Sequence, residues 1–195
     1  FCLKKTKCIT AYLLFGIIRR MSKAKLFLAS DHAGFEHKNT LRDYLESHDS
    51  HGYEVVDLGA HVYDENDDYP QYIAEAARLV SANPTRDKAI VFGGSGQGEA
   101  IVANKYFGVR ATVYYGGEPA IIALAREHNN ANILSIGARF VSEKETIQRV
   151  QEWLVTKYKR GTRHERRIAQ INALEDRRFW KRFINLVRKA KQSIV

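Results

Sequence analysis

A short apolar run followed at once by a glycine-rich loop and a helix start is the feature that most constrains this chain. The run Ala89–Phe92 is apolar and partly β-branched, which is typical of a strand buried in a parallel sheet. Four of the next six residues are glycines, which let a backbone turn sharply and approach a ligand closely: Gly93, Gly94, Gly96 and Gly98. The following helix begins near Glu99, where free backbone N–H groups can bind an anion or an oxyanion.

The familiar sites built on such loops do not match this one. A P-loop needs Gly-Lys-Ser/Thr after its spacer, and none is present. A dinucleotide fingerprint counted from Gly94 would need its third glycine at Glu99, and the acidic ribose partner is also missing. The loop places Ser95 between two glycines, which is not the elbow of a serine hydrolase. A tight turn without a ligand rarely needs four glycines, so we expect a ligand here.

Short apolar runs alternate with amphipathic segments along the chain. Strands are predicted at 25–29, 54–58, 89–92, 109–114 and 132–136, and helices at 35–45, 72–80, 99–105, 118–126 and 143–159. Ser142 is expected to cap the last of these helices, with Glu145 three residues on. This alternation predicts a parallel sheet covered on both faces, in which ligands bind beyond the carboxyl ends of the strands. Asp31, His32, the glycine loop and residues 137–139 all follow predicted strands at that edge.

The net charge of +9 belongs to the two ends of the chain. Residues 1–20 and residues 175–195 each carry +5, and the residues between them carry −1, which speaks against a nucleic-acid partner. The only methionine is Met21, so we interpret residues 1–20 as a non-native leader or upstream translated segment, with a targeting peptide as the alternative. The predicted organisation is therefore a leader at 1–20, a domain at 21–175 and a basic amphipathic tail at 176–195.

Both cysteines, Cys2 and Cys8, lie in the predicted leader. The rest of the chain has no thiol for a disulfide, a metal site or a nucleophile, which suits a cytoplasmic protein. No apolar run is long enough for a membrane helix, because the longest, Ile9–Ile18, is too short to span a bilayer.

The ionisable groups outside the two ends suit proton abstraction next to a carbonyl in a phosphorylated substrate. They comprise one loop carboxylate, an Asp-His pair, a His-Asn pair and several arginines: Glu99, Asp31, His32, His128, Asn129, Arg139, Arg163 and Arg167. Arg163 and Arg167 lie four residues apart, so both guanidinium groups can reach one anion from the same helix face. Taken singly, each histidine is also typical of a hydrogen-bonded structural residue, and the arginines are also typical of a solvent-exposed helix face. The histidines have no metal-ligand spacing.

Five ordered motifs over about residues 24–175 resemble ribose-5-phosphate isomerase type B, in a family that includes isomerases of galactose 6-phosphate: SDHAGFEHK, DLGA with DDYP, GGSGQGEAIVANK, REHNNAN and RHERRI. The resemblance implies a Rossmann-like three-layer α/β/α fold with a C-terminal helix extension. It implies a pentose phosphate pathway enzyme that interconverts ribose 5-phosphate and ribulose 5-phosphate through an enediolate. It further implies no metal or cofactor, and a homodimer or dimer of dimers with its sites at the subunit interface.

The resemblance also assigns roles to individual residues. Glu99, His128 and Ser95 would be catalytic, with Glu99 as the base and His128 as the acid that opens the sugar ring. Substrate would be bound by residues from four of the five motifs and by Arg139: Asp31, His32, Gly94, Ser95, Gly96, Gln97, Gly98, Asn129, Arg139, Arg163 and Arg167. Gly94–Gly98 would supply backbone donors to the enediolate, and the last two arginines would reach across the dimer to phosphate.

One departure from the family pattern concerns the base. Many members carry a cysteine at the first loop position, where this chain has Gly93, and the chain resembles the subgroup whose base is a glutamate at the loop's end. We expect Glu99 to be ionised at neutral pH without any special shift of its pKa. Two alternatives stay open: an isomerase of a six-carbon sugar phosphate, such as galactose 6-phosphate or allose 6-phosphate, and a non-catalytic sugar-phosphate sensor.

Overall fold

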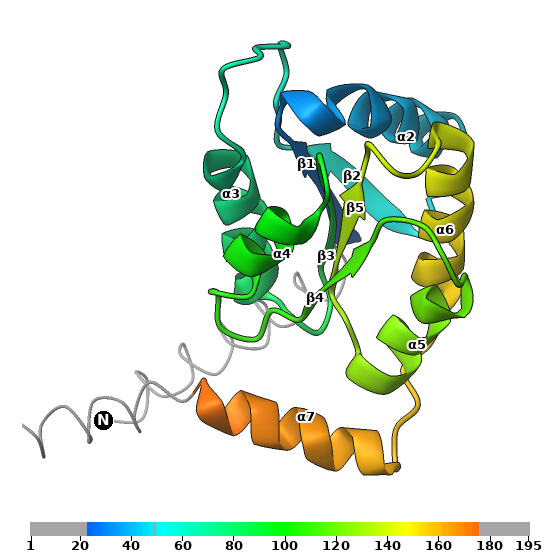
Figure 1. The fold of residues 1–195 in the computed structure, drawn as a ribbon. Coiled ribbons are helices and arrows are strands. Elements are labelled where there is room, and N and C mark those ends of the chain that lie inside the picture. The colour runs from blue at the N-terminus through cyan, green and yellow to red at the C-terminus, as the bar shows by residue number, and fades with distance from the viewer. Residues whose placement is uncertain (1–22, 49, 176–195) are drawn as a thin grey trace, which may run out of the picture.

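The computed structural model describes residues 23–48 and 50–175, which form a parallel sheet between two layers of helices (Figure 1). Five strands pair in the order β2-β1-β3-β5-β4, with bounds β1 Ala24–Ser30, β2 Tyr53–Asp57, β3 Lys88–Gly93, β4 Ala111–Tyr114 and β5 Ile133–Gly137. All four pairings are parallel. The predicted three-layer α/β/α fold is therefore confirmed.

Helices cover both faces of the sheet: α2 Phe35–Ser47, α3 Tyr69–Ala82, α4 Gln97–Ala103, α5 Ala120–Asn129 and α6 Glu143–Val155, with α7 Arg163–Leu174 beyond them. Successive strand residues point to opposite faces, so β1 contributes to two cores. Leu26 and Leu28 pack with α2, α5 and α6, whereas Phe27 and Ala29 pack with α3 and α4. Each face of the sheet is thereby buried, as expected where parallel strands are continuously apolar.

Several helix ends differ from the sequence prediction, three of them for clear local reasons. Helix α3 begins at Tyr69 because Pro70 fits the first turn, where its missing N–H is not needed. Helix α4 begins two residues early, at Gln97, after Gly96 adopts a left-handed conformation with φ of 76°. Helix α6 ends at Val155, four residues early, because Thr156 is extended. Ser142 caps α6 as predicted and accepts a hydrogen bond from the Glu145 backbone at 3.2 Å.

Two predicted segments, the leader at 1–20 and the tail at 176–195, lie outside the described residues. The helix on which Arg163 and Arg167 were expected to share a face is α7, which contacts α5 at the lower end of the molecule in Figure 1. Within the described ranges, no helix combines the length and the apolar character that a membrane crossing requires.

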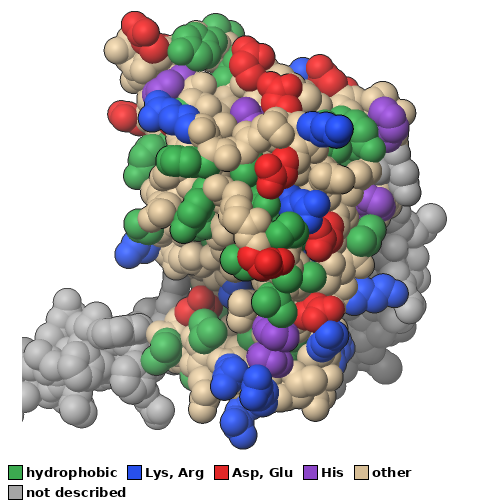
Figure 2. All heavy atoms as spheres, turned by 45° about the vertical axis from the view of Figure 1, so that its right-hand side comes forward, with side chains coloured by type: hydrophobic (Ala, Val, Ile, Leu, Met, Phe, Trp, Pro, Cys, Tyr) green, Lys and Arg blue, Asp and Glu red, His purple; other side chains and the backbone are tan. Residues whose placement is uncertain are grey.

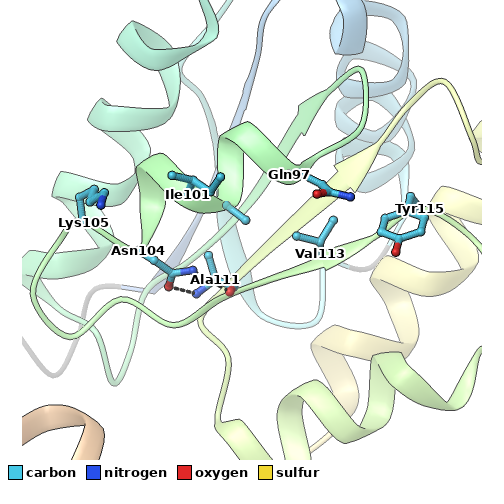
Figure 3. Close-up of a pocket in the computed structure, with 8 residues that line it drawn as sticks. Gln97, Ile101, Asn104, Lys105, Ala111, Val113 and Tyr115 are labelled. Carbon is cyan, nitrogen blue, oxygen red and sulfur yellow. Dashed lines mark hydrogen bonds between the residues drawn. The ribbon is translucent and has the colours of Figure 1, made fainter.

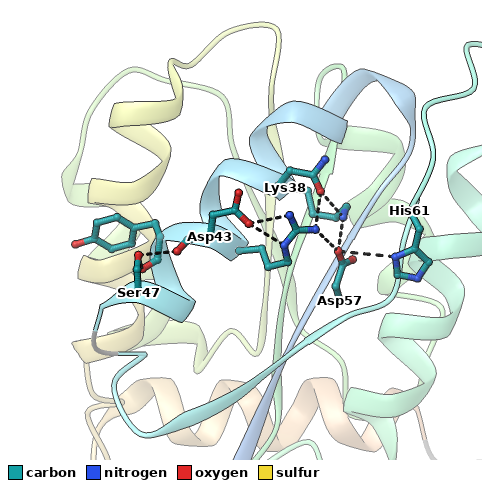
Figure 4. Close-up of polar contacts among 8 residues, drawn as sticks. Lys38, Asp43, Ser47, Asp57 and His61 are labelled. Carbon is teal, nitrogen blue, oxygen red and sulfur yellow. Dashed lines mark hydrogen bonds and ion pairs between the residues drawn. The ribbon is translucent and has the colours of Figure 1, made fainter.

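A buried ion pair fixes the carboxyl end of β2 (Figure 4). Lys38 of α2 is fully buried, and its Nζ lies 2.6 Å from Oδ2 of Asp57. Burial alone would raise the pKa of Asp57, but the hydrogen bonds from Lys38 and the Gly59 backbone outweigh it and lower that pKa. Gly59 and Ala60 in turn exchange backbone hydrogen bonds of 2.8 Å with Ser30 at the end of β1. The pair therefore supports the sheet edge at which β1 ends.

Candidate active site

The carboxyl edge of the sheet gathers three polar segments, one after each of β1, β3 and β5. Asp31 follows β1 directly, the glycine loop follows β3, and Arg139 lies just beyond β5. The loops are joined by backbone bonds from Ala138 to Gly93 at 2.9 Å and from Arg139 to Gly94 at 3.2 Å. Ser95 is exposed at the loop's tip. The structure thus places the residues predicted at this edge beside one another.

Glu99 lies in the first turn of α4, is 4% exposed, and its side chain folds back over the loop. Its carboxylate occupies the space that a side chain on Gly93 would fill, because a Cβ built there overlaps both carboxylate oxygens and Cδ. A side chain at position 93 would therefore require the Glu99 carboxylate to move from this position.

On the base role that the family resemblance implies for Glu99, we expect Gly93→Ala to lower kcat by about 100-fold or more. The new methyl group would displace the Glu99 carboxylate, and a shift of about 1 Å in a reacting group can cost that much. Steady-state kinetics with ribose 5-phosphate, the substrate that the resemblance implies, measures the effect, and circular dichroism with competitive inhibition by phosphate controls for fold and binding. A variant with wild-type kcat would show that the position of Glu99 is not critical.

Burial raises the pKa of Glu99, and the negative charge of nearby Asp31 adds to the rise. The expectation that Glu99 needs no special shift is therefore wrong, because its carboxylate is withdrawn from water rather than held at an open helix end. The pKa of Asp31 is also raised by burial, with His32 acting in the opposite direction. A carboxylate with a raised pKa is a stronger base than free glutamate, provided that it stays ionised at the working pH.

Asp67 is a site residue that the sequence reasoning did not single out. Its Oδ1 lies 2.7 Å from Nδ1 of His32 and accepts the His32 backbone N–H at 2.9 Å. The hydrogen bond to Asp67 raises the pKa of His32 and orients its ring. Asp31, His32 and Asp67 place ligand atoms within 4.8 Å of one another, a spacing that could hold a cation.

Tyr69 is the second residue that was missed. Its hydroxyl would lie 2.7 Å from a Cβ placed on Gly98, so the tyrosine packs directly against the glycine loop. Asp67 and Tyr69 both belong to the DDYP motif, which was the available signal. An exposed acidic loop carries no periodicity that reveals where it folds back, so only the motif could have pointed to these two side chains.

The remaining predicted site residues lie at the opposite, amino edge of the sheet. Helix α5 runs back from the end of β4, so His128 and Asn129 in its last turn lie near the start of β5. His128 stacks on His164 of α7, with ring centroids 3.9 Å apart and an angle of 4° between the planes. Arg163 and Arg167 are exposed on α7, and Figure 2 shows histidine and basic side chains gathered at the lower end of this face. One chain therefore does not bring these four residues to Glu99.

The chain is similar to known proteins in both sequence and structure. Residues 26–171 match the family described as Ribose/Galactose Isomerase. Ribose-5-phosphate isomerase B of Mycolicibacterium paratuberculosis is 42% identical over 144 residues, which span 74% of this chain and 87% of the relative. The Escherichia coli enzyme of that name is 36% identical, over 79% of this chain and 98% of its own. A crystal structure of the Mycoplasma genitalium enzyme with bound ribulose 5-phosphate superposes with a TM-score of 0.73 at 37% identity, covering 78% of this chain and 97% of that one.

Proposed function

Because the chain belongs to the ribose/galactose isomerase family, we infer that it interconverts ribose 5-phosphate and ribulose 5-phosphate. The relatives named above carry that activity in their names, and one binds ribulose 5-phosphate. The observation within this structure that carries the proposal is Glu99, a buried carboxylate held against a glycine loop beside Asp31 and His32. The reaction belongs to the pentose phosphate pathway, and we propose a cytoplasmic enzyme.

In the proposed reaction, Glu99 removes the proton from C2 of the open-chain aldose and returns it to C1. A second proton passes from the C2 hydroxyl to the C1 oxygen, so the C1 carbonyl becomes a hydroxyl, the C2 hydroxyl becomes a carbonyl, and no outside oxidant or reductant is needed. Negative charge develops on the substrate oxygens in the enediolate, and the backbone N–H groups of Gly94–Gly98 are the donors proposed to stabilise it. Base and oxyanion donors then come from one strand-loop-helix unit.

We propose that a second copy of this chain completes each site. Glu99 lies at the carboxyl edge of the sheet, whereas His128, Asn129, Arg163 and Arg167 lie at the amino edge. An antiparallel arrangement of two copies would bring the amino edge of one to the carboxyl edge of the other. His128 of the second copy would open the sugar ring, and its Asn129 would hold a hydroxyl. Arg139 of the first copy would bind the phosphate group together with the two α7 arginines of the second copy.

An exposed groove beside the edge strand supports such a pairing (Figure 3). Helix α4 and strand β4 line a groove of about 570 Å³, and Figure 3 shows Ile101, Val113 and Tyr115 along it. Ile101 is 63% exposed and Tyr115 is 50% exposed. Exposed apolar side chains next to an unpaired strand edge mark a protein interaction surface. Because this groove adjoins the loop at Gln97, a second copy seated on it would lie next to the site.

We expect Arg167→Ala to weaken substrate binding about tenfold or more without unfolding the chain. A charge-assisted hydrogen bond to phosphate contributes roughly 1.5–3 kcal/mol, and Arg167 is exposed on α7, so its loss leaves no cavity. KM for ribose 5-phosphate and the inhibition constant for free phosphate should rise together. Arg166→Ala is the matched control, since Arg166 is exposed on the same helix but is not four residues from Arg163. Equal effects of the two substitutions would contradict a specific phosphate contact.

The family description also includes galactose, so isomerisation of a six-carbon sugar phosphate is the second candidate. A coupled assay of the full chain with ribose 5-phosphate, galactose 6-phosphate and allose 6-phosphate separates the two. We expect the highest kcat/KM with ribose 5-phosphate. Turnover of a six-carbon substrate alone would favour the second candidate, and binding without turnover of any would indicate a sugar-phosphate sensor.

A further inference from the structure

A cationic cavity lies at the amino edge of the sheet, at the end opposite to Glu99. Its volume is about 700 Å³, and it opens between the starts of β2 and β3, the end of α5 and the segment that follows α6. Four of its lining residues are basic in addition to one histidine, namely Lys88, Arg126, Lys157 and Arg160. Among the described residues that line it, none is acidic.

Two of these basic residues are buried. Lys88 is 8% exposed, its Nζ donates a hydrogen bond to the Tyr53 hydroxyl, and it lies 4.7 Å from the centre of that ring. Arg126 is 7% exposed and lies 5.2 Å from the Trp153 ring. Its NH1 donates to Asn130 and to the Ala131 carbonyl, whereas its Nε has no hydrogen-bond partner within the described part of the chain. The hydrogen-bond partners of both cations are therefore neutral groups.

Lys38, the other buried lysine among the described residues, has the carboxylate partner that Lys88 lacks. Lys38 is fully buried and lies 2.6 Å from the Asp57 carboxylate. Neither Lys88 nor Arg126 forms an ion pair with any carboxylate of the described residues, and the side chain of adjacent Asp87 accepts the backbone N–H of Lys25. Burial lowers the pKa of Lys88 to about 8, and the positive charge of Arg126 contributes to that fall, whereas the negative charge of Asp87 acts in the opposite direction. A buried cation without an ion-pair partner is costly, and a bound anion would offset the cost.

We propose that this cavity is a second anion site, which binds the phosphate group of a small phosphorylated molecule or free phosphate. Lys88 and Arg126 form its floor, and exposed Lys157 and Arg160 lie at its rim. Several converging cations suit a dianion, and Asn130 and Thr85 add neutral hydrogen-bonding groups. The volume lies within the range of small-molecule sites, so the cavity has room for more than phosphate alone.

The site is separate from the catalytic residues of the same chain. Arg126 faces inward against Trp153, whereas His128, two residues along α5, stacks on His164 of α7. Side chains two residues apart on a helix do not share a face. Occupation of the cavity and occupation of the active site can therefore be measured independently.

The test titrates inorganic phosphate into the full chain by calorimetry and measures competitive inhibition by phosphate in parallel. Competitive inhibition reports only the phosphate that binds in the active site. We expect calorimetry to detect one further phosphate per wild-type chain, bound in the cavity. Lys88→Met keeps the aliphatic stem but removes the charge, and it should weaken that additional binding about tenfold or more while the inhibition constant stays unchanged. Lys144→Met is the matched control, because Lys144 is exposed on α6 and lines neither this cavity nor the groove in Figure 3, and it should change neither value.

Arg160→Ala is a second variant that cannot fail through misfolding, because Arg160 is exposed. It should weaken the additional binding several-fold. Glycerol 3-phosphate, titrated in the same way, identifies the source of the ligand: tighter binding than inorganic phosphate indicates an ester, and weaker binding indicates the free ion. The proposal is overturned if the wild type binds no additional phosphate, or if Lys88→Met and Arg160→Ala both bind it as the wild type does.

Discussion

Mixing Glu99→Gln chains with His128→Asn chains is expected to restore activity that neither variant has alone. Each variant should lose about 10²-fold or more, since each lacks one proton-transferring group. In a mixed dimer, one of the sites combines Glu99 of one chain with His128 of the other, so both groups are intact there. Random mixing should then recover about a quarter of wild-type activity.

The measurement is the isomerase rate after the two variants are unfolded together and refolded. Each variant refolded alone at the same total concentration is the control, and wild type carried through the same steps sets the scale. The reason for the expectation is the position of the two residues at opposite edges of one sheet. If mixed chains are no more active than the separate variants, each site is built within one chain.

Glu99→Gln by itself is expected to lower kcat by about 10²–10⁴-fold, the usual contribution of a general base. Glutamine has the size of glutamate but cannot accept the C2 proton, so binding of phosphate should stay as in the wild type. The acidic limb of the wild-type pH profile should have its midpoint above the ordinary glutamate value of 4.5, because burial raises the pKa of Glu99. Activity should be lost as the pH falls through that raised value.

The same substitution should make the fold more stable at pH 7. With its pKa raised in the folded state, Glu99 is deprotonated in the unfolded chain at a lower pH than in the folded chain. Folding stability therefore falls as the pH rises through the interval between the two values, and the cost persists above it. Thermal unfolding should give a higher Tm for Glu99→Gln at pH 7, with the difference shrinking near pH 4. A lower Tm at pH 7 would show that the carboxylate stabilises the fold.

The fold could be predicted because the spacing of apolar residues and the positions of glycines are local properties of the sequence. The run Ala89–Phe92 is buried as expected, and its partners across the sheet have the same apolar pattern. Helix ends were less certain because neighbours decide them: Lys159 pairs its backbone N–H with the Glu127 carbonyl instead of continuing α6. A contact of that kind joins residues far apart in the chain and leaves no local pattern.

The candidate site was predictable in part for the same reason. Residues that directly follow strands had to lie at the carboxyl edge, so Asp31 and the glycine loop could be placed from topology alone. The raised pKa of Glu99 could not be foreseen, because it depends on the side chain folding over Gly93. The buried pair of Lys38 and Asp57 was also missed, since charged residues in an exposed-looking pattern give no sign of burial.

Exchange of the C2 hydrogen of ribose 5-phosphate with solvent deuterium tests most directly whether Glu99 is the base. Proton NMR in deuterated buffer follows the C2 signal with the full-length wild type, Glu99→Gln and Arg166→Ala. We predict rapid exchange with the wild type and with Arg166→Ala, and loss of exchange by the same 10²–10⁴-fold factor as kcat with Glu99→Gln. Exchange at the wild-type rate with Glu99→Gln would contradict the assignment and identify another residue as the base, with Asp31 the first to test.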